Sequence, residues 1–320
     1  MMNNKIPFYQ ERNFGDKFNV VFAFVKENWR YMIRYILYGA LPLAMFAALS
    51  LGKFLSDTLK MQTTQSTPFD AMFFGNYALL LVLSLLSCLW IGSLIFSYIQ
   101  LYNDRENGLE GITFEDLKPY LKRNAWRMVK CSLVLVLLSL VVLGIIIGGF
   151  VINVWWLSLI LMALAMIACI PVLMFMPTYI YEDVTVWRAL SRGFWLGWKT
   201  WGGIFALGFV LSLLSNVISM VFVMPWEICL MVKAIFIGDD SSQFTPSIIL
   251  SLMQYIFGVF MWVGQLLLST LFFVSISYLY SHAAELLDDM SVTKGIEDFE
   301  GMADENPDDD ELFQKPEPLV

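Results

Sequence analysis

Long apolar stretches alternate with short polar segments along the chain as far as residue 282. A helix needs about 20 consecutive apolar residues to cross a lipid bilayer. Six stretches approach or exceed this length without a single Asp, Glu, Lys or Arg. The pattern predicts an all-α integral membrane protein with six transmembrane helices. The spans cover approximately Tyr35–Gly52, Tyr77–Ile99, Cys131–Phe150, Trp155–Thr178, Trp201–Met224 and Gly258–Tyr280.

Polar and helix-breaking residues between the spans predict where the helices end. Residues 53–76 are polar, and we expect a loop there. We expect Pro225 to end the fifth span, because proline removes a backbone donor. Residues 246–282 are apolar over more than one span length. This stretch either projects beyond the bilayer as one helix or bends near Gly258 or Gly264. We favour a helical turn or two at the outer surface followed by the sixth span.

A basic segment that contains tryptophan precedes the first, third and fifth spans. In residues 14–34, apolar side chains recur at helical spacing while Lys26, Arg30 and Arg34 line another face. Such a helix suits the membrane interface, where anionic lipid head groups attract Lys and Arg. We therefore expect three units, each an amphipathic interfacial helix followed by a two-helix hairpin. The expected lipid contacts are Lys26, Trp29, Arg30, Arg34, Lys122, Arg123, Trp126, Arg127, Arg188, Arg192 and Trp201.

The ends of the second, fourth and sixth spans support the same threefold repeat. Each span ends in a pair of tyrosines, and a polar or acidic step follows. Tyrosine and tryptophan gather at any membrane interface, which explains the residue types. This tendency explains less well why the same order recurs three times: an aromatic end, a polar step, a basic helix and then a new span. The tyrosine pairs are Tyr98 and Tyr102, Tyr179 and Tyr181, and Tyr278 and Tyr280.

Between residues 178 and 211, an acidic residue ends one span, and an Ala-Leu-x-x-x-aromatic helix leads through tryptophan into the next. The residues of this pattern are Glu182, Ala189, Leu190, Phe194, Trp195, Lys199 and Trp201. The segment resembles a recurring element of the membrane domain attached to bacterial glycerophosphoryl diester phosphodiesterases, and of related polytopic families. The resemblance is architectural over the remaining chain. It implies a membrane fold and no activity, because no length is left for a phosphodiesterase barrel.

The positive charges are distributed unevenly around the six spans. If the N-terminus lies in the cytoplasm, cytoplasmic segments hold 17 of the 20 Lys and Arg residues. Positive residues favour the cytoplasmic side of a membrane protein. We therefore expect a multi-pass protein of the bacterial cytoplasmic (inner) membrane with both termini in the cytoplasm. We expect anionic membrane lipids as partners on that side, and no nucleic acid.

The net charge of −8 comes from the last part of the chain, since residues 283–320 hold 13 Asp and Glu and only two Lys. This composition, with few aromatic residues, is typical of disorder. The chain thus divides into residues 1–34, with the first interfacial helix, a membrane domain at 35–282 and an acidic cytoplasmic tail at 283–320. The tail is either only solvated or a docking element for a protein partner. Its docking residues are then Asp308, Asp309, Asp310, Glu311, Leu312 and Phe313.

Residues suited to catalysis are scarce. The six spans contain no charged residue, the only histidine is His282, and the four cysteines are scattered. A metal centre needs several such ligands together, and intramembrane catalysis needs ionisable groups. We expect no metal, no cofactor and no enzymatic activity.

Some small and polar residues within or near the spans predict contacts between helices. Gly144 and Gly148, and likewise Ala44 and Ala48, are four residues apart, and we expect them to pack helices within this chain. Polar side chains in the spans favour interhelical hydrogen bonds and, as the alternative, contacts to a ligand. The candidates are Asn216, Gln254 and Gln265.

Together these features favour a non-enzymatic inner-membrane protein that organises lipid or a partner complex. The absent catalytic residues, the basic interfacial helices and the separate tail lead to this hypothesis. The alternative is a carrier for a lipid or an amphipathic small molecule, with its site near the three polar candidates. A membrane enzyme ranks third.

Overall fold

The computed structural model of the chain describes residues 5–64, 71–105, 107–238, 248–290 and 292. Within these ranges the protein is built from helices and contains no strand, so the all-α prediction is confirmed. Six helical segments are long and apolar enough to cross a membrane. The helices are α1 (Phe14–Thr64), α2 (Ala71–Asp104), α3 (Phe114–Val151), α4 (Trp155–Val172), α5 (Phe175–Tyr181), α6 (Val186–Lys199), α7 (Trp201–Gly238) and α8 (Ile248–Asp288).

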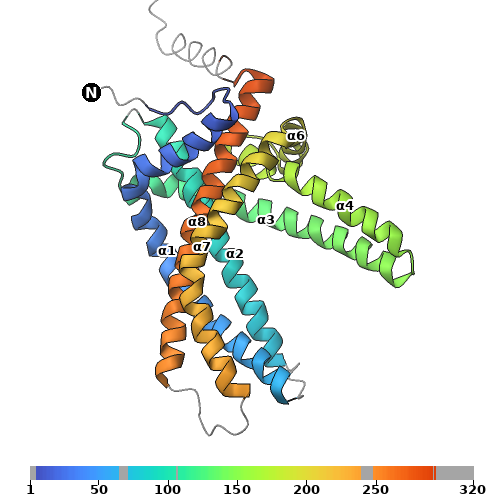
Figure 1. The fold of residues 1–320 in the computed structure, drawn as a ribbon. Coiled ribbons are helices and arrows are strands. Elements are labelled where there is room, and N and C mark those ends of the chain that lie inside the picture. The colour runs from blue at the N-terminus through green and yellow to red at the C-terminus, as the bar shows by residue number, and fades with distance from the viewer. Residues whose placement is uncertain (1–4, 65–70, 106, 239–247, 291, 293–320) are drawn as a thin grey trace, which may run out of the picture.

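Four of the long helices form a bundle. Helices α1, α2, α7 and α8 run side by side, with α8 in contact with the other three (Figure 1). Helices α3 and α4 form a hairpin that diverges from this bundle, and α5 and α6 lie at its base (Figure 1). The buried residues of α3 all lie between Leu117 and Cys131, in its first half. The outer half of the hairpin therefore exposes its apolar side chains.

Two of the three basic segments continue into the following span without a break. Helix α1 runs through residues 14–34 and the first span, and α3 likewise joins the second basic segment to the third span. Thr113 and Asp116 form a capping box at the start of α3. Only the third basic segment forms a helix of its own, α6, which a turn at Thr200 separates from α7. No proline or helix-ending glycine lies between the segment and the span in α1, so its backbone hydrogen bonds continue.

The expected loop at residues 53–76 is largely helical. Helix α1 continues to Thr64 and α2 begins at Ala71, so the loop prediction is wrong for most of this segment. Helix-forming residues such as Leu, Lys and Met outweigh the polar character of residues 53–61. Side-chain polarity alone does not end a helix that projects from the bilayer into water.

The expected interruptions of the last two spans are also absent. Helix α7 passes through Pro225 to Gly238, and α8 is continuous from Ile248 to Asp288. At 1.5 Å per residue α8 is about 60 Å long, twice the roughly 30 Å bilayer core. Helix α8 therefore continues through Gly258 and Gly264 without a break, and its length exceeds that of one span.

The two glycines allow close helix packing. A Cβ atom on Gly264 would lie 2.2 Å from Cγ of Phe222, and one on Gly258 would lie 3.2 Å from Cβ of Ala48. These positions let α7 and α1 approach α8 closely. Ala44 and Ala48 are buried, so the packing predicted for this pair is confirmed.

A tight contact fixes the base of the α3–α4 hairpin. The fourth span is broken at residues 173–174 into α4 and α5, and α6 crosses this break. A Cβ atom on Gly197 would lie 2.5 Å from Cα of Pro171, and one on Gly193 would lie 2.8 Å from the backbone of Phe175. Only glycine permits this approach of two backbones.

The predicted packing of Gly144 and Gly148 is wrong. A Cβ atom on either glycine would meet nothing within 4 Å. Both lie in the outer half of α3, where the hairpin has left the bundle, and the described part of the chain places no second helix against this face.

Candidate functional site

Five of the six tyrosines at the ends of the even-numbered spans belong to one core, whereas Tyr179 packs in a separate small cluster with Cys131, Phe175 and Ala189. Tyr102 from α2, Tyr181 from α5 and Tyr280 from α8 lie at the end of the bundle near the chain's N-terminus, which we call the N-terminal end. The rings of Tyr181 and Tyr280 are stacked with their centroids 5.5 Å apart. Tyr280 is 0% exposed. Sequence order indicated a repeat of aromatic ends, and the structure shows that these ends are a common core.

An ion-pair network links α5, α6 and α8 beside this core. Arg192 contacts Oε2 of Glu182 at 2.6 Å and Oδ2 of Asp288 at 2.8 Å. The Tyr280 hydroxyl donates to Oε1 of Glu182 at 2.8 Å. The Glu182 side chain is only 11% exposed, so its charge depends on these partners. Arg192 thus neutralises a carboxylate of the protein and is held away from lipid.

A second network holds the start of α3 against the end of α5. Asn124 is fully buried and donates to Oγ of Ser97 at 2.9 Å and Oε1 of Gln100 at 2.8 Å. Gln100 in turn donates to the carbonyl of Ile180 at 3.1 Å. Arg127 donates to the same carbonyl at 3.2 Å. These donors satisfy carbonyl groups that a helix leaves unpaired at its C-terminus.

Arg127 also forms an ion pair with Asp183. The hydrogen bond from Arg127 lowers the pKa of this carboxyl group below its ordinary value. The Asp183 side chain is 82% exposed, in contrast to neighbouring Glu182. Two adjacent acids therefore differ in role: one is enclosed by the network and one is mostly solvated.

The N-terminal segment closes over the cluster. The Arg12 guanidinium donates to the carbonyls of Phe8, at 3.1 Å, and Pro7, and lies over the ring of Tyr278. The backbone N–H of Arg12 donates to Nδ1 of His282 at 3.1 Å. Burial lowers the pKa of Arg12. The single histidine of the chain is therefore a structural acceptor in this arrangement.

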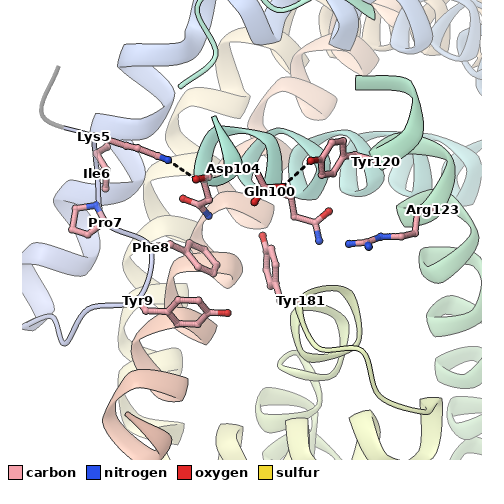
Figure 2. A pocket seen from close by; sticks show the side chains of 11 residues that line it. Lys5, Ile6, Pro7, Phe8, Tyr9, Gln100, Asp104, Tyr120, Arg123 and Tyr181 are labelled. Carbon is pink, nitrogen blue, oxygen red and sulfur yellow. Dashed lines mark hydrogen bonds between the residues drawn. The ribbon is translucent and has the colours of Figure 1, made fainter. Parts of the chain in front are cut away.

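A cavity of about 540 Å³ opens between the N-terminal segment, α2, α3 and α5. Figure 2 shows Lys5 at one side and Arg123 at the other, with Tyr181 between them. Asp104 is the acidic residue of the lining and accepts from the Tyr120 hydroxyl at 2.8 Å. The lining consists of Lys5, Ile6, Pro7, Phe8, Tyr9, Gln100, Asn103, Asp104, Tyr120, Arg123 and Tyr181.

The chemistry of this cavity suits an oxyanion. Two cationic side chains outnumber one carboxylate. Burial, followed by the charge of Glu182, raises the pKa of Tyr9 from 10.0 to about 12, and its hydroxyl is protonated at neutral pH at either value. Phosphate oxygens accept hydrogen bonds from Lys, Arg and hydroxyl donors.

Most of the basic residues expected at the lipid interface are exposed at the N-terminal end. Lys26, Arg30, Arg34, Lys122, Arg123 and Arg188 are exposed. Trp126 is 63% exposed, Trp29 is partly exposed, and Trp201 donates from its indole to the carbonyl of Ile167 at 3.2 Å. Arg127 and Arg192 differ from the group because both bind carboxylates of the chain. Sequence spacing could not separate these two from the exposed arginines.

The three polar candidates from the spans do not form one site. Asn216 and Gln265 line a cavity of about 310 Å³ between α7 and α8. Gln265 donates to Oγ of Ser219, and Asn216 donates to the carbonyl of Ser212. Gln254 lies elsewhere, near the opposite end of the bundle.

The predicted docking residues 308–313 lie outside the described residues, as does most of the predicted tail. Helix α8 continues to Asp288, so the first residues of that tail belong to the membrane helix. The described ranges contain no group of three or more His, Cys, Asp or Glu residues placed to hold a metal ion.

The chain matches no model of a known protein family, no curated protein and no solved structure in our comparisons. Its class follows from the fold. Among the residues that the structure describes, six helices have the length and composition to cross a membrane, which makes the chain a multi-pass membrane protein.

Proposed function

We propose that this is a non-enzymatic protein of the bacterial inner membrane that organises anionic lipid at its cytoplasmic face. The observation that carries the proposal is the pairing of a rigid core with a basic rim at one end of the molecule. The core consists of the tyrosines and ion pairs that join α2, α5 and α8. The rim consists of the exposed Lys and Arg side chains named above, of which Arg123 also lines the cavity.

Each part contributes a physical requirement of lipid organisation. Exposed cations near a membrane surface each attract anionic lipid by about 1 kcal/mol. The cavity with Lys5 and Arg123 adds a defined place for one head group. The diverging α3–α4 hairpin leaves apolar faces on both itself and the bundle, and acyl chains fit such faces (Figure 1).

Lipid retention tests the proposal. The full chain, purified in mild detergent, is analysed by native mass spectrometry for co-purified lipid. We expect phosphatidylglycerol to be enriched over phosphatidylethanolamine, and the Lys5→Gln, Arg123→Gln double variant to lose one bound lipid. Lys199→Gln, an exposed cation outside the cavity, is the matched control. Identical lipid retention in all three proteins would contradict the proposal.

The tail offers a separate route to a protein partner. Its test is a pull-down from native membranes with the full chain and with a chain ending at Val292. This end point retains Asp288, which pairs with Arg192. A partner that is lost with the shortened chain assigns docking to residues 293–320. Equal recovery from both chains would argue against a docking tail.

A carrier is the second candidate, and one observation favours it. Asn216 and Gln265 lie together in the cavity between α7 and α8, which is otherwise mainly apolar. Flux of a labelled lipid in proteoliposomes, lost in Gln265→Leu and kept in Gln254→Leu, would support a carrier. Absence of flux for every lipid tested would count against it.

A further inference from the structure

A second polar cavity lies at the end of the bundle opposite the N-terminal end. It has a volume of about 410 Å³ and is formed by α1, α7 and α8. Lys53, Ser56 and Asp57 come from α1, Lys233 from α7, and Gln254 from α8. Two cations and one carboxylate give this cavity a positive balance. Lys233 lies on α7, which continues past Pro225 to Gly238.

Gln254 is the feature that points to a ligand. Its side chain is 4% exposed, and its Oε1 accepts from Nζ of Lys233 at 3.2 Å. The carboxamide is thereby oriented, with its oxygen toward the ammonium group and its Nε2 turned away. Nε2 finds no acceptor among the residues that the structure describes. A buried amide donor without an acceptor is unfavourable, so an oxyanion in the cavity would satisfy it.

Lys233 is placed to supply charge to the same oxyanion. Its Nζ donates to Oγ of Ser56 at 2.9 Å as well as to Gln254. Ser56 donates onward to the carbonyl of Gly52, so its lone pairs face the ammonium group. The contacts fix the position of the charge next to the unsatisfied amide.

The position along α7 matches the head-group region of the second leaflet. Lys233 lies 32 residues after Trp201, or about 48 Å along an uninterrupted helix. A bilayer with its head groups is about 40–45 Å thick. If Trp201 marks one interface, Lys233 reaches the other.

We propose that Lys233 and Gln254 bind a phosphate group at this end of the bundle, as carried by a phospholipid head group of the leaflet opposite the N-terminal end. The phosphate accepts the Gln254 amide N–H and lies beside the Lys233 ammonium, and Lys53 stands at the cavity mouth. The site goes beyond the proposed function, because it shares no residue with the Lys5 and Arg123 cavity.

Native mass spectrometry of the full chain titrated with phosphatidylglycerol tests this site. We expect Gln254→Leu and Lys233→Met each to lower the occupancy of one bound lipid at least about fivefold. Lys233→Arg should keep it, since the charge remains. Lys199→Met is the matched control for Lys233→Met, because Lys199 is an exposed cation that lines neither polar cavity. Diacylglycerol with the same acyl chains should not bind at this position.

Soluble glycerol phosphate separates the two sources of the phosphate. Binding that depends on Lys233 and Gln254 supports the site with a free phosphate compound as its ligand. Binding of phosphatidylglycerol alone supports the site with a lipid ligand. Unchanged lipid occupancy in both Gln254→Leu and Lys233→Met, or equal binding of diacylglycerol, would overturn the proposal.

Two controls keep this result independent of folding and of the other cavity. Circular dichroism checks each variant, and Gln254→Leu carries the test if Lys233→Met does not fold. The Lys5→Gln, Arg123→Gln double variant should keep the lipid at this site while losing a different one. A negative result for the Lys233 and Gln254 site can therefore be distinguished from a negative result for the proposed function.

Discussion

Two pairs of glycines share one spacing and have opposite surroundings. Gly193 and Gly197 on α6 press against the backbone of α4 and α5, whereas Gly144 and Gly148 on α3 contact nothing within 4 Å. The first pair lies at the base of the hairpin and the second on its outer half. The comparison shows that two glycines four residues apart permit close helix packing but do not ensure it. Whether a helix arrives there depends on the path of the rest of the chain.

The largest expected effect comes from filling one glycine of each pair. In Gly197→Leu the new side chain meets the backbone of Pro171, which cannot move without shifting α4. We expect a loss of about 3 kcal/mol in the free energy of unfolding. Gly148→Leu enters open space, and we expect a change within about 0.5 kcal/mol. Unfolding by denaturing detergent measures both. Equal losses in the two variants would refute the contrast.

The next effect concerns the ion pairs of Arg192 with Glu182 and Asp288 at the base of the α3–α4 hairpin. Glu182→Gln leaves Arg192 with only Asp288 as its carboxylate partner. We expect a loss of about 2 kcal/mol, less than for a fully buried pair because Arg192 is partly exposed. Asp183→Asn is the adjacent control, with an expected loss below about 1 kcal/mol. If Asp183→Asn proves the more damaging change, the network is wrongly assigned.

A smaller effect probes the hairpin itself. The Ser158 hydroxyl in α4 donates to the carbonyl of Ile146 in α3 at 3.0 Å. Hydrogen bonds between membrane helices contribute about 0.6 kcal/mol, and Ser158→Ala should lose this amount. Ser139 donates within its own helix, so Ser139→Ala should be nearly neutral. Thermal unfolding of both variants in one detergent makes the comparison.

The smallest effect depends on pH. The ion pair with Arg127 lowers the pKa of Asp183 in the folded state. The resulting stabilisation is fully present above the unfolded carboxyl pKa of 3.8 and is lost as the pH falls through the lower folded pKa. Because Asp183 is mostly exposed, we expect less than about 0.5 kcal/mol. Between pH 5 and pH 3, Asp183→Asn should lose less stability than the native chain. An equal loss of stability in the native chain and in Asp183→Asn would show that Asp183 does not contribute this pH-dependent stabilisation.

The apolar spans and the basic segments could be predicted because they depend on local composition. The positions of the helix ends were predicted less accurately. Pro225, Gly258 and Gly264 are helix-breaking residues by propensity, yet α7 and α8 continue through them. At Gly264 the missing side chain makes room for Phe222 of α7.

The site was only partly predictable for a related reason. The tyrosine pairs stood out by their order along the sequence, but their meeting in one core requires the ends of α2, α5 and α8 to converge. In the sequence, Arg127 and Arg192 cannot be distinguished from the exposed arginines. The structure separates them, because Asp183 pairs with Arg127 and Glu182 pairs with Arg192. The separation of Gln254 from Asn216 and Gln265 likewise depends on which end of α8 each residue occupies.

The sequence by itself determined that this chain is helical and built for a membrane, because stretches of about 20 apolar residues satisfy the bilayer whatever their neighbours are. The tertiary structure decided which polar groups are buried together and which glycines pack. Both depend on contacts between residues up to hundreds of positions apart, such as Arg12 with His282. Local composition carries no information on such contacts, because burial changes the energy of a polar group only when a specific partner arrives.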